Sequence, residues 1–182
     1  MANIETNNSG IVFPEVINKF NVYNDAGRIV GTTGEVSLTD LQAVTAEISG
    51  AGILGQYNTA IIGAFQSMSQ EIPFRMIDAD FFGMLNAGEQ SKLVLRSTVQ
   101  QRNRETGGTL STMAMRVVFR GHPTGAKLGS MKVGDMMNAS ITLELTYILI
   151  EMGGVVMLEL DKLNSIYKVN GKDLLAEIRK QC

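Results

Sequence analysis

The residues that could do chemistry are few in this chain, and they are scattered. Gly50, Gly52 and Gly55 have the GxGxxG spacing of a dinucleotide-binding loop. Such a loop needs a strand before it, a helix after it and an acidic residue about 20 positions later. The segment that follows, YNTAIIG, is instead typical of a strand. The sequence therefore indicates a flexible turn at 50–55 rather than a nucleotide site.

Two further candidates for acid–base chemistry have simpler explanations. His122, the single histidine, stands beside Pro123 in a glycine-rich segment with no candidate partner nearby, which is typical of a solvated loop residue. Asp78 and Asp80 could form a carboxylate pair. Capping of a helix explains Asp78, however, and stabilisation of the first helical turn explains Asp80.

A basic cluster on neighbouring predicted strands is the last chemical candidate. It could bind phosphate, but a formal net charge of −2 favours a solvated or subunit-facing side of a sheet. A hydrolase is disfavoured because no nucleophile–histidine–acid set is present. We therefore expect a non-enzymatic protein without cofactor or metal site. The cluster comprises Arg96, Arg102, Arg104, Arg116 and Arg120.

Composition is that of an ordinary folded protein. The 182 residues are 45% hydrophobic and 19% charged, which predicts one domain and excludes wholesale disorder. No apolar run approaches the ~20 residues that span a bilayer. The segment MANIETNNSG lacks the basic start and apolar core of a secretory signal. The single cysteine, Cys182, cannot form an internal disulfide, and folding in the cytosol fits all of these features.

The elements that would position any site are mostly strands. The segment 138–150 alternates in hydrophobicity, which predicts a half-buried strand. Gly153 and Gly154 favour a hairpin turn into a return strand. A terminal helix over 170–178 is predicted with Asn170 as its cap. The predicted apolar face of the long strand is Ile141, Leu143, Leu145, Tyr147 and Leu149.

The rest of the chain reads as a mainly β domain with one short helix at 79–85, capped by Asp78. Segment 39–49 fits a helix or a strand. We expect an N-terminal arm at 1–18, a single domain at 19–182 and a long loop at 121–137 within it. Further strands are predicted at 19–23, 28–38, 57–65, 70–76, 92–101 and 115–120.

Residues 111–178 resemble the major tail tube protein of contractile-tailed bacteriophages, a family shared with R-type bacteriocins. The resemblance is carried by VVFRG (117–121), LTYILI (145–150), ELDKLN (159–164) and above all KVNGKDLLAE (168–177). FNVYNDAG (20–27), SGAGILG (49–55) and QQRNRETGG (100–108) match in the same order. The chain departs from the family in a longer N-terminal arm and in the loop 124–137.

The resemblance implies a tail-tube fold, which is a β-sandwich or barrel of antiparallel strands with one or two short helices. Six subunits would form a ring with a continuous inner β-barrel, and stacked rings would form a channel for DNA or ions. The implied partners are further copies of the chain, a sheath protein, and tape-measure and baseplate proteins. DNA would pass through without specific binding, and no membrane anchor is implied.

The implied location is a virion tail or a bacteriocin particle made in the bacterial cytoplasm. Two alternatives remain open at this point. One is the haemolysin-coregulated tube protein of type VI secretion, which shares the architecture. The other is a monomeric β-barrel binding module, which would be monomeric in solution and have a ligand-sized apolar pocket. The sequence also leaves open whether the particle carries DNA and which strand faces line a channel.

Assembly contacts are assigned as a hypothesis. The arm 1–18 and the loops 49–55 and 121–137 would provide ring-to-ring contacts, and the terminal helix would seal a flank. A helix of about ten residues is marginal alone, so it must dock on its own subunit or on a neighbour. The candidate assembly residues are Ile53, Leu54, His122, Met131, Met136, Leu174, Leu175 and Ile178.

Overall fold

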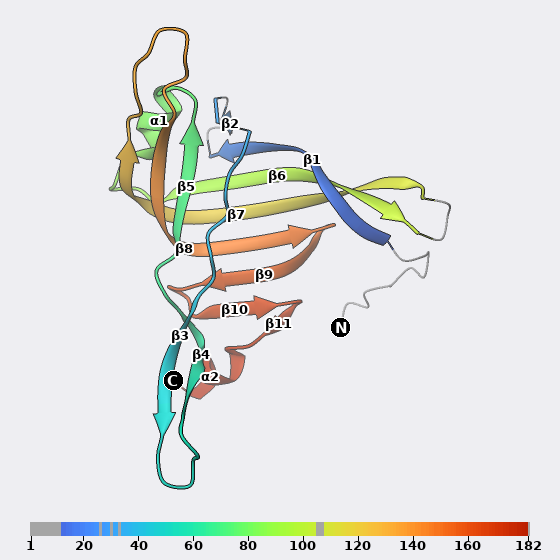
Figure 1. Ribbon diagram of the computed structural model, residues 1–182, viewed down its shortest axis with the longest axis vertical. Coiled ribbons are helices and arrows are strands. Elements are labelled where there is room, and N and C mark those ends of the chain that lie inside the picture. Colours follow the sequence, from blue (N-terminus) through green and yellow to red (C-terminus); the bar gives the residue numbers. More distant parts are fainter. Residues whose placement is uncertain (1–11, 26, 30, 33, 105–107, 182) are drawn as a thin grey trace.

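The computed structural model describes residues 12–181 except 26, 30, 33 and 105–107, so most of the predicted arm lies outside the described residues (Figure 1). As predicted, the chain is mainly β, with antiparallel strands and two short helices. The elements are β1 (Val12–Asn24), β2 (Gly27–Ile29), β3 (Ala43–Ser49), β4 (Gln56–Phe65), β5 (Ser69–Phe74), α1 (Ala79–Met84), β6 (Ser91–Asn103), β7 (Leu110–Lys127), β8 (Ala139–Met152), β9 (Val155–Asp161), β10 (Ile166–Val169), β11 (Lys172–Asp173) and α2 (Ala176–Gln181).

Two sheets are present in the described part of the chain. The larger has the order β11-β10-β9-β8-β7-β6-β1-β2, and β5 pairs with the first half of β8 off this path. The smaller consists of β3 and β4 alone, which form a hairpin that projects away from the rest of the subunit (Figure 1). Neither helix of the described residues is long and apolar enough to cross a membrane.

The core lies on one face of the large sheet, where alternate residues of β6, β7 and β8 point inward. Helix α1 closes one end of it. Asp78 accepts a hydrogen bond from the Phe81 backbone N–H at 2.9 Å, as its predicted role as a cap requires. The Phe81 ring meets Phe74 edge-on at 5.3 Å between centroids. The largest core residues are Met68, Ile72, Phe74, Phe81, Leu93, Phe119, Ile141, Leu143, Leu145, Ile148 and Leu160.

Several predicted boundaries were wrong. Strand β1 begins at Val12, so residues 12–18 are paired strand rather than irregular arm. Strand β7 continues to Lys127, which leaves a loop at 128–138 instead of 121–137. Of the strand expected at 28–38, only the short β2 forms. Segment 39–49, for which the sequence fitted a helix or a strand, contains β3. In each case the pairing partner along the neighbouring strand sets the limit, and that partner is distant in sequence.

The buried face of β8 changes phase halfway along the strand. Leu143 and Leu145 are buried as predicted, but Ile148 is buried next instead of Tyr147. Arg120 of β7 pairs with Tyr147 while Gly121 pairs with Leu145, so Thr146 is an extra residue in the ladder. A bulge of this kind moves all later side chains to the opposite face. The prediction that Tyr147 and Leu149 continue the buried face of this strand was therefore wrong.

The C-terminal helix is shorter than predicted, and Asn170 is not its cap. Asn170 and Gly171 have φ values of 49° and 76° and form the two-residue turn between β10 and β11. Helix α2 begins only at Ala176. The Asn-Gly pair was a hairpin signal that the helical interpretation overlooked. The Gly153–Gly154 turn is confirmed, with φ values of 56° and 83° between β8 and β9.

Residues 34–42 form a strap without regular structure that crosses the face of the large sheet and leads into β3 (Figure 1). The fully buried side chain of Gln70 fixes this strap to β5. Its Oε1 accepts a hydrogen bond from the Thr39 backbone N–H at 3.0 Å, and its Nε2 donates to the carbonyl of Ser37 at 2.7 Å. Gln70 thus determines where the chain enters the projecting hairpin.

Replacement of Gln70 by Leu should lower the free energy of unfolding by about 1–3 kcal/mol, because the Thr39 N–H and the Ser37 carbonyl would lose their partner. Urea unfolding followed by circular dichroism measures this change. Gln66→Leu is the matched control, since the Gln66 side chain is exposed. Equal stability of the two variants would contradict the assigned role of Gln70.

Candidate assembly surfaces

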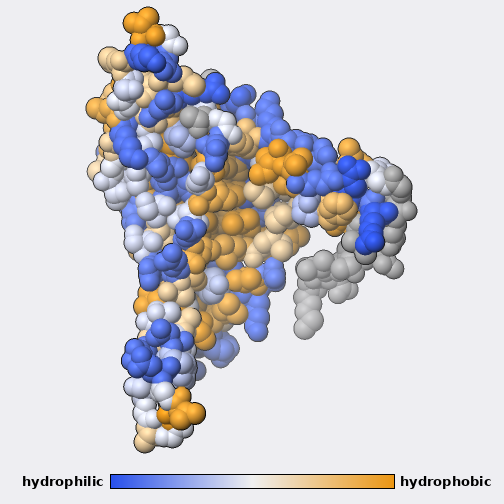
Figure 2. Space-filling model, in the orientation of Figure 1, coloured by the Kyte–Doolittle hydropathy of each residue, from blue (hydrophilic) through white to orange (hydrophobic). Residues whose placement is uncertain are grey.

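Apolar side chains are exposed at both ends of the long axis of the subunit (Figures 1 and 2). At one end, the tip of the β3–β4 hairpin carries Ile53 and the fully exposed Leu54. At the other end, the loop 128–138 carries Met131, which is 86% exposed, and Met136. Exposed apolar groups at opposite ends are typical of surfaces that meet other protein chains.

The loop 128–138 has a defined conformation. The Ser130 backbone N–H donates to the carbonyl of Met137 at 2.9 Å, and the Met137 N–H donates to the carbonyl of Arg75 at 2.9 Å. Gly129 has a φ of 79°, and a Cβ there would overlap the Met137 carbonyl oxygen. The neck of the loop is therefore closed against Arg75, the residue after β5, while its apolar tip projects.

A third surface lies at the C-terminal segment and departs from the predicted stripe. Leu174 and Ile178 are partly exposed, but Leu175 is buried against Gly63 of β4, where its side chain occupies the space that a Cβ would take. Asp173 pairs with Arg179 at 2.5 Å, and this hydrogen bond lowers the pKa of the Asp173 carboxyl group. Leu175 thus anchors the base of the hairpin, and the two other residues face outward.

His122 does not lie in a loop as predicted. It is an exposed residue of β7 opposite Glu144 of β8. The structure therefore distributes the eight candidate residues over four places instead of bringing them together. Sequence reasoning also missed several exposed apolar side chains. The sequence did contain a signal for Tyr57, Ile61 and Ile62, because no charged residue occurs between Glu47 and Glu71. The missed residues are Val16, Ile17, Tyr57, Ile61, Ile62, Leu128 and Val133.

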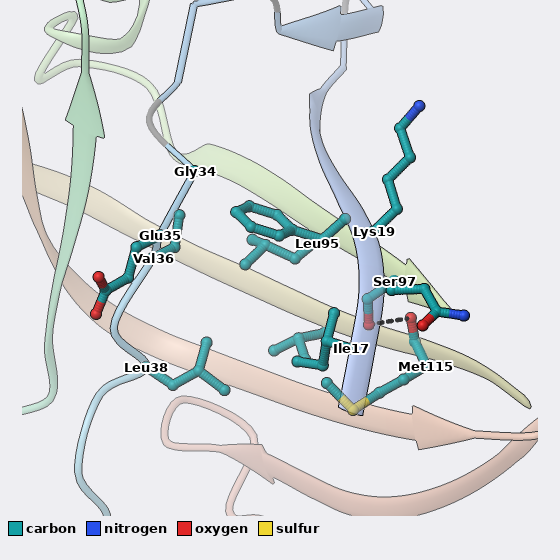
Figure 3. Close-up of a pocket in the computed structure, with 12 residues that line it drawn as sticks. Ile17, Lys19, Gly34, Glu35, Val36, Leu38, Leu95, Ser97 and Met115 are labelled. Atoms are coloured by element: carbon teal, nitrogen blue, oxygen red, sulfur yellow. Dashed lines mark hydrogen bonds between the residues drawn. The ribbon is translucent and has the colours of Figure 1, made fainter. Parts of the chain in front are cut away.

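An apolar hollow of about 470 Å³ lies between the strap and the large sheet (Figure 3). Strands β1, β6 and β7 contribute its floor, including Ile17, Leu95 and Met115, and the strap contributes Val36 and Leu38. Asn18, Lys19, Glu35 and Ser97 also line the hollow. The described residues contain no cluster of three histidine, cysteine or acidic side chains suited to a metal ion. The apolar part of the lining can take up apolar groups.

The basic cluster does not converge on one point. The Arg96 guanidinium stacks on Tyr23 at 4.7 Å from the ring centroid, and Arg120 stacks on Tyr147 at 4.6 Å. Arg116 pairs with Glu151 of β8 at 2.5 Å. Guanidinium groups engaged separately on one sheet face fit the solvated or subunit-facing interpretation better than a phosphate site.

Local electrostatics agree with structural roles for the remaining charged groups. Arg102 donates a hydrogen bond to Glu15, which joins the first half of β1 to β6 and lowers the pKa of the Glu15 carboxyl group. Glu71 accepts hydrogen bonds from Ser140 and Lys127, which lower its pKa. Burial and the neighbouring Glu159 raise the pKa of the Tyr147 hydroxyl group. These contacts hold strands together.

A mainly β fold with exposed apolar projections at two ends fits the class of structural assembly proteins. Residues 14–182 match the family described as phage tail tube protein FII, so the chain belongs to this family of tail tube proteins. The family and its curated relatives are structural proteins, and the chain is accordingly structural rather than an enzyme.

Two curated relatives extend over nearly the whole chain. The tail tube protein of Escherichia phage P2 is 25% identical over 93% of this chain and 98% of its own length. The major tail tube protein of Serratia phage KSP20 is 27% identical over 90% of this chain and 92% of its own length. These relatives confirm the resemblance drawn from the sequence.

Solved structures share the fold. A chain of the PVC extracellular contractile injection system, from the sheath/tube terminator in its extended state, superposes with a TM-score of 0.53. It is 19% identical, and the match covers 76% of this chain and 97% of that chain. A chain of the PVC sheath–tube complex in the extended state gives the same score, identity and share of this chain, and 92% of that chain is covered.

Proposed function

We propose that this chain is the subunit of the rigid inner tube of a contractile phage tail or R-type bacteriocin, with six copies in each ring and rings stacked around a channel. The observation that carries the proposal is the pair of apolar projections at opposite ends of the subunit. Copies joined by one repeated head-to-tail contact form either a closed ring or an open filament. In a stack of rings, one contact closes each ring and a second contact joins successive rings.

In this proposal the hairpin tip with Ile53 and Leu54 and the loop tip with Met131 and Met136 contact neighbouring rings. The partly exposed Leu174 and Ile178 contact a flank of an adjacent subunit, and Leu175 supports the base of the hairpin. His122 lies near the end of β7, at the border between subunits. Ring contacts were also assigned to the arm 1–18, most of which lies outside the described residues.

The further partners follow from the same role. A sheath protein surrounds the tube, and tape-measure and baseplate proteins contact its inside and its end. The names of the matched PVC assemblies, which contain both sheath and tube, support the sheath as a partner. DNA passes through the channel without specific binding if the particle is a phage. The subunit is made in the host cytoplasm and resides in the particle.

Negative-stain microscopy of the purified protein tests the proposal. Hollow tubes or six-fold rings of uniform diameter are the expected result, and a protein that remains monomeric at all concentrations would overturn it. A monomeric binding module would instead use the hollow beneath the strap as a ligand pocket, and its apolar lining is the observation that favours this second candidate.

Replacement of Leu54 by Asp should suppress tube formation without changing the stability of the subunit. Burial of a leucine side chain contributes about 1.5–3 kcal/mol, so its loss should raise the protein concentration needed for assembly at least about tenfold. Sedimentation and microscopy over a concentration series measure the change. Leu163→Asp is the matched control, because Leu163 is a largely exposed leucine in the β9–β10 turn. Normal tubes from the Leu54 variant would contradict the role of the hairpin tip.

A further inference from the structure

Thioether side chains gather at one end of the subunit. Met76, Met131 and Met136 are the exposed methionines of the part of the chain that the structure describes. Met131 and Met136 lie on the loop 128–138, which is the orange loop that projects at the upper end of Figure 1. Met76 comes directly after the residue whose carbonyl accepts hydrogen bonds from the neck of this loop. All three exposed methionines therefore belong to the same end of the molecule.

Met136 and Met137 are neighbours in the sequence but differ in exposure. The Met136 side chain is 49% exposed, whereas the Met137 side chain is 7% exposed. Met137 is held at the neck of the loop, because its N–H donates to the carbonyl of Arg75 and its carbonyl accepts from the Ser130 N–H. A reagent dissolved in water therefore reaches the sulfur atom of Met136 far more readily than that of Met137.

The conformation of the loop is held by groups other than its exposed thioethers. The Asp135 N–H donates to the carbonyl of Lys132 at 3.2 Å, and the Lys132 ammonium group pairs with the Asp135 carboxylate at 3.3 Å. The Met136 backbone N–H donates to the same carboxylate at 2.9 Å. These contacts involve backbone groups and charged side chains. A chemical change at the sulfur of Met131 or Met136 should therefore leave the loop folded.

The chemistry open to an exposed thioether is oxygen transfer from a hydroperoxide. A sulfur lone pair attacks one peroxide oxygen, the O–O bond breaks, and a proton moves to the leaving oxygen, which departs as water when the oxidant is hydrogen peroxide. The sulfur atom is oxidised by two electrons to a sulfoxide, and the peroxide is reduced by two electrons. The thioether is apolar and adaptable in packing, whereas the sulfoxide is polar. Methionine sulfoxide reductases reverse the change.

We propose that Met131 and Met136 form a reversible oxidation site that controls assembly, with hydroperoxides as the oxidant. Their sulfoxides prevent the loop from packing on a neighbouring ring, because a sulfoxide oxygen buried without a donor loses its hydrogen bonds to water. The inference rests on the proposed tube function, in which this loop contacts the next ring. It adds a state of the free subunit in which the fold is intact and stacking is blocked. Assembly covers both side chains and protects them.

Treatment of the purified free subunit with hydrogen peroxide tests the proposal. Peptide mass spectrometry should show sulfoxide at Met131 and Met136 at least about tenfold sooner than at Met137. Circular dichroism should be unchanged, and the protein concentration needed for tube formation should rise at least about tenfold. Methionine sulfoxide reductases should restore assembly. Equally fast oxidation of Met137, loss of the fold, or normal tubes from subunits oxidised at both sites would overturn the proposal.

Leucine variants assign the effect to the two sulfur atoms. The double variant Met131→Leu, Met136→Leu nearly conserves volume and polarity, so it should form tubes and should still form them after peroxide treatment. Met76→Leu is the matched control, because Met76 is exposed at the same end but lies outside the loop. Its assembly should remain sensitive to peroxide. Sensitivity that persists in the double variant, or that disappears with Met76→Leu, would contradict the assignment.

Tubes formed before peroxide is added separate this inference from the proposed function. Met131 and Met136 should oxidise at least about tenfold more slowly in wild-type tubes than in free subunits, because the neighbouring ring covers them. Equal rates in tubes and subunits would overturn the inference and leave the tube function intact. Untreated wild-type protein that forms no tubes would count against the proposed function itself.

Discussion

Replacement of Leu175 by Asp is expected to abolish tube assembly and to lower the free energy of unfolding by about 3 kcal/mol or more. Leu175 is only 6% exposed, and it fills the space above Gly63, whose φ of 77° and missing Cβ permit the contact. A carboxylate at this position would be buried without a partner. The base of the β3–β4 hairpin would separate from the C-terminal segment, and the hairpin would lose its direction.

Two variants distinguish this role from a general loss of stability. Leu175→Met conserves volume and polarity, so it should cost less than about 1.5 kcal/mol and still form tubes. Leu163→Asp introduces the same charge at an exposed position and should leave assembly unchanged. Urea unfolding and electron microscopy of the three variants provide the measurements. Tubes of normal abundance from Leu175→Asp would refute the anchoring role of Leu175.

The second large effect is expected at Gly121, where replacement by Ala should destabilise the subunit by about 3 kcal/mol or prevent its folding. Gly121 is buried at the bulge where β7 and β8 change register. A Cβ at this position would overlap the backbone carbonyl of Glu144, which cannot move as a flexible side chain could. The two strands that form the centre of the sheet would have to separate locally.

Gly125→Ala provides the control for folding, because Gly125 lies on the same strand and a Cβ there meets nothing within 4 Å. Thermal unfolding followed by circular dichroism compares the two variants. We expect soluble, folded protein from Gly125→Ala and a markedly lower unfolding temperature or insoluble protein from Gly121→Ala. Equal unfolding temperatures would show that the bulge can adjust, and the assigned close approach would then be wrong.

Both predictions concern features that set the direction of strands within the fold. The bulge at Thr146 turns the second half of β8 away from β5, so that the first halves of β8 and β5 form one sheet and the second half continues toward β9. Leu175 and the Gln70 contacts then place the hairpin beside that sheet. The proposed ring contacts depend on these internal positions as much as on the exposed tips.

Much of the fold could be predicted because its signals are local. Alternation of apolar residues predicted the segments that became β6, β7 and β8, and Asp78 predicted the start of α1. The Gly153–Gly154 pair predicted the β8–β9 hairpin. Each depends on residues adjacent in sequence, whose side-chain direction or backbone freedom is the same in any surrounding structure. The order of short motifs also indicated the tail tube family, which the match over 14–182 confirms.

The tertiary structure alone decided where the alternation breaks, which strands end unpaired and which leucine is buried. Thr146 shifts the buried face of β8 because the register with β7 passes from Leu145–Gly121 to Tyr147–Arg120 and leaves it out, and Leu175 is buried where Gly63 lacks a side chain. The extent of β1 and β7 depends on partners far along the chain. The sequence thus determined a β-rich tail tube protein. The bounds of its strands and the burial of Leu175 follow from contacts between distant residues, which no local pattern encodes.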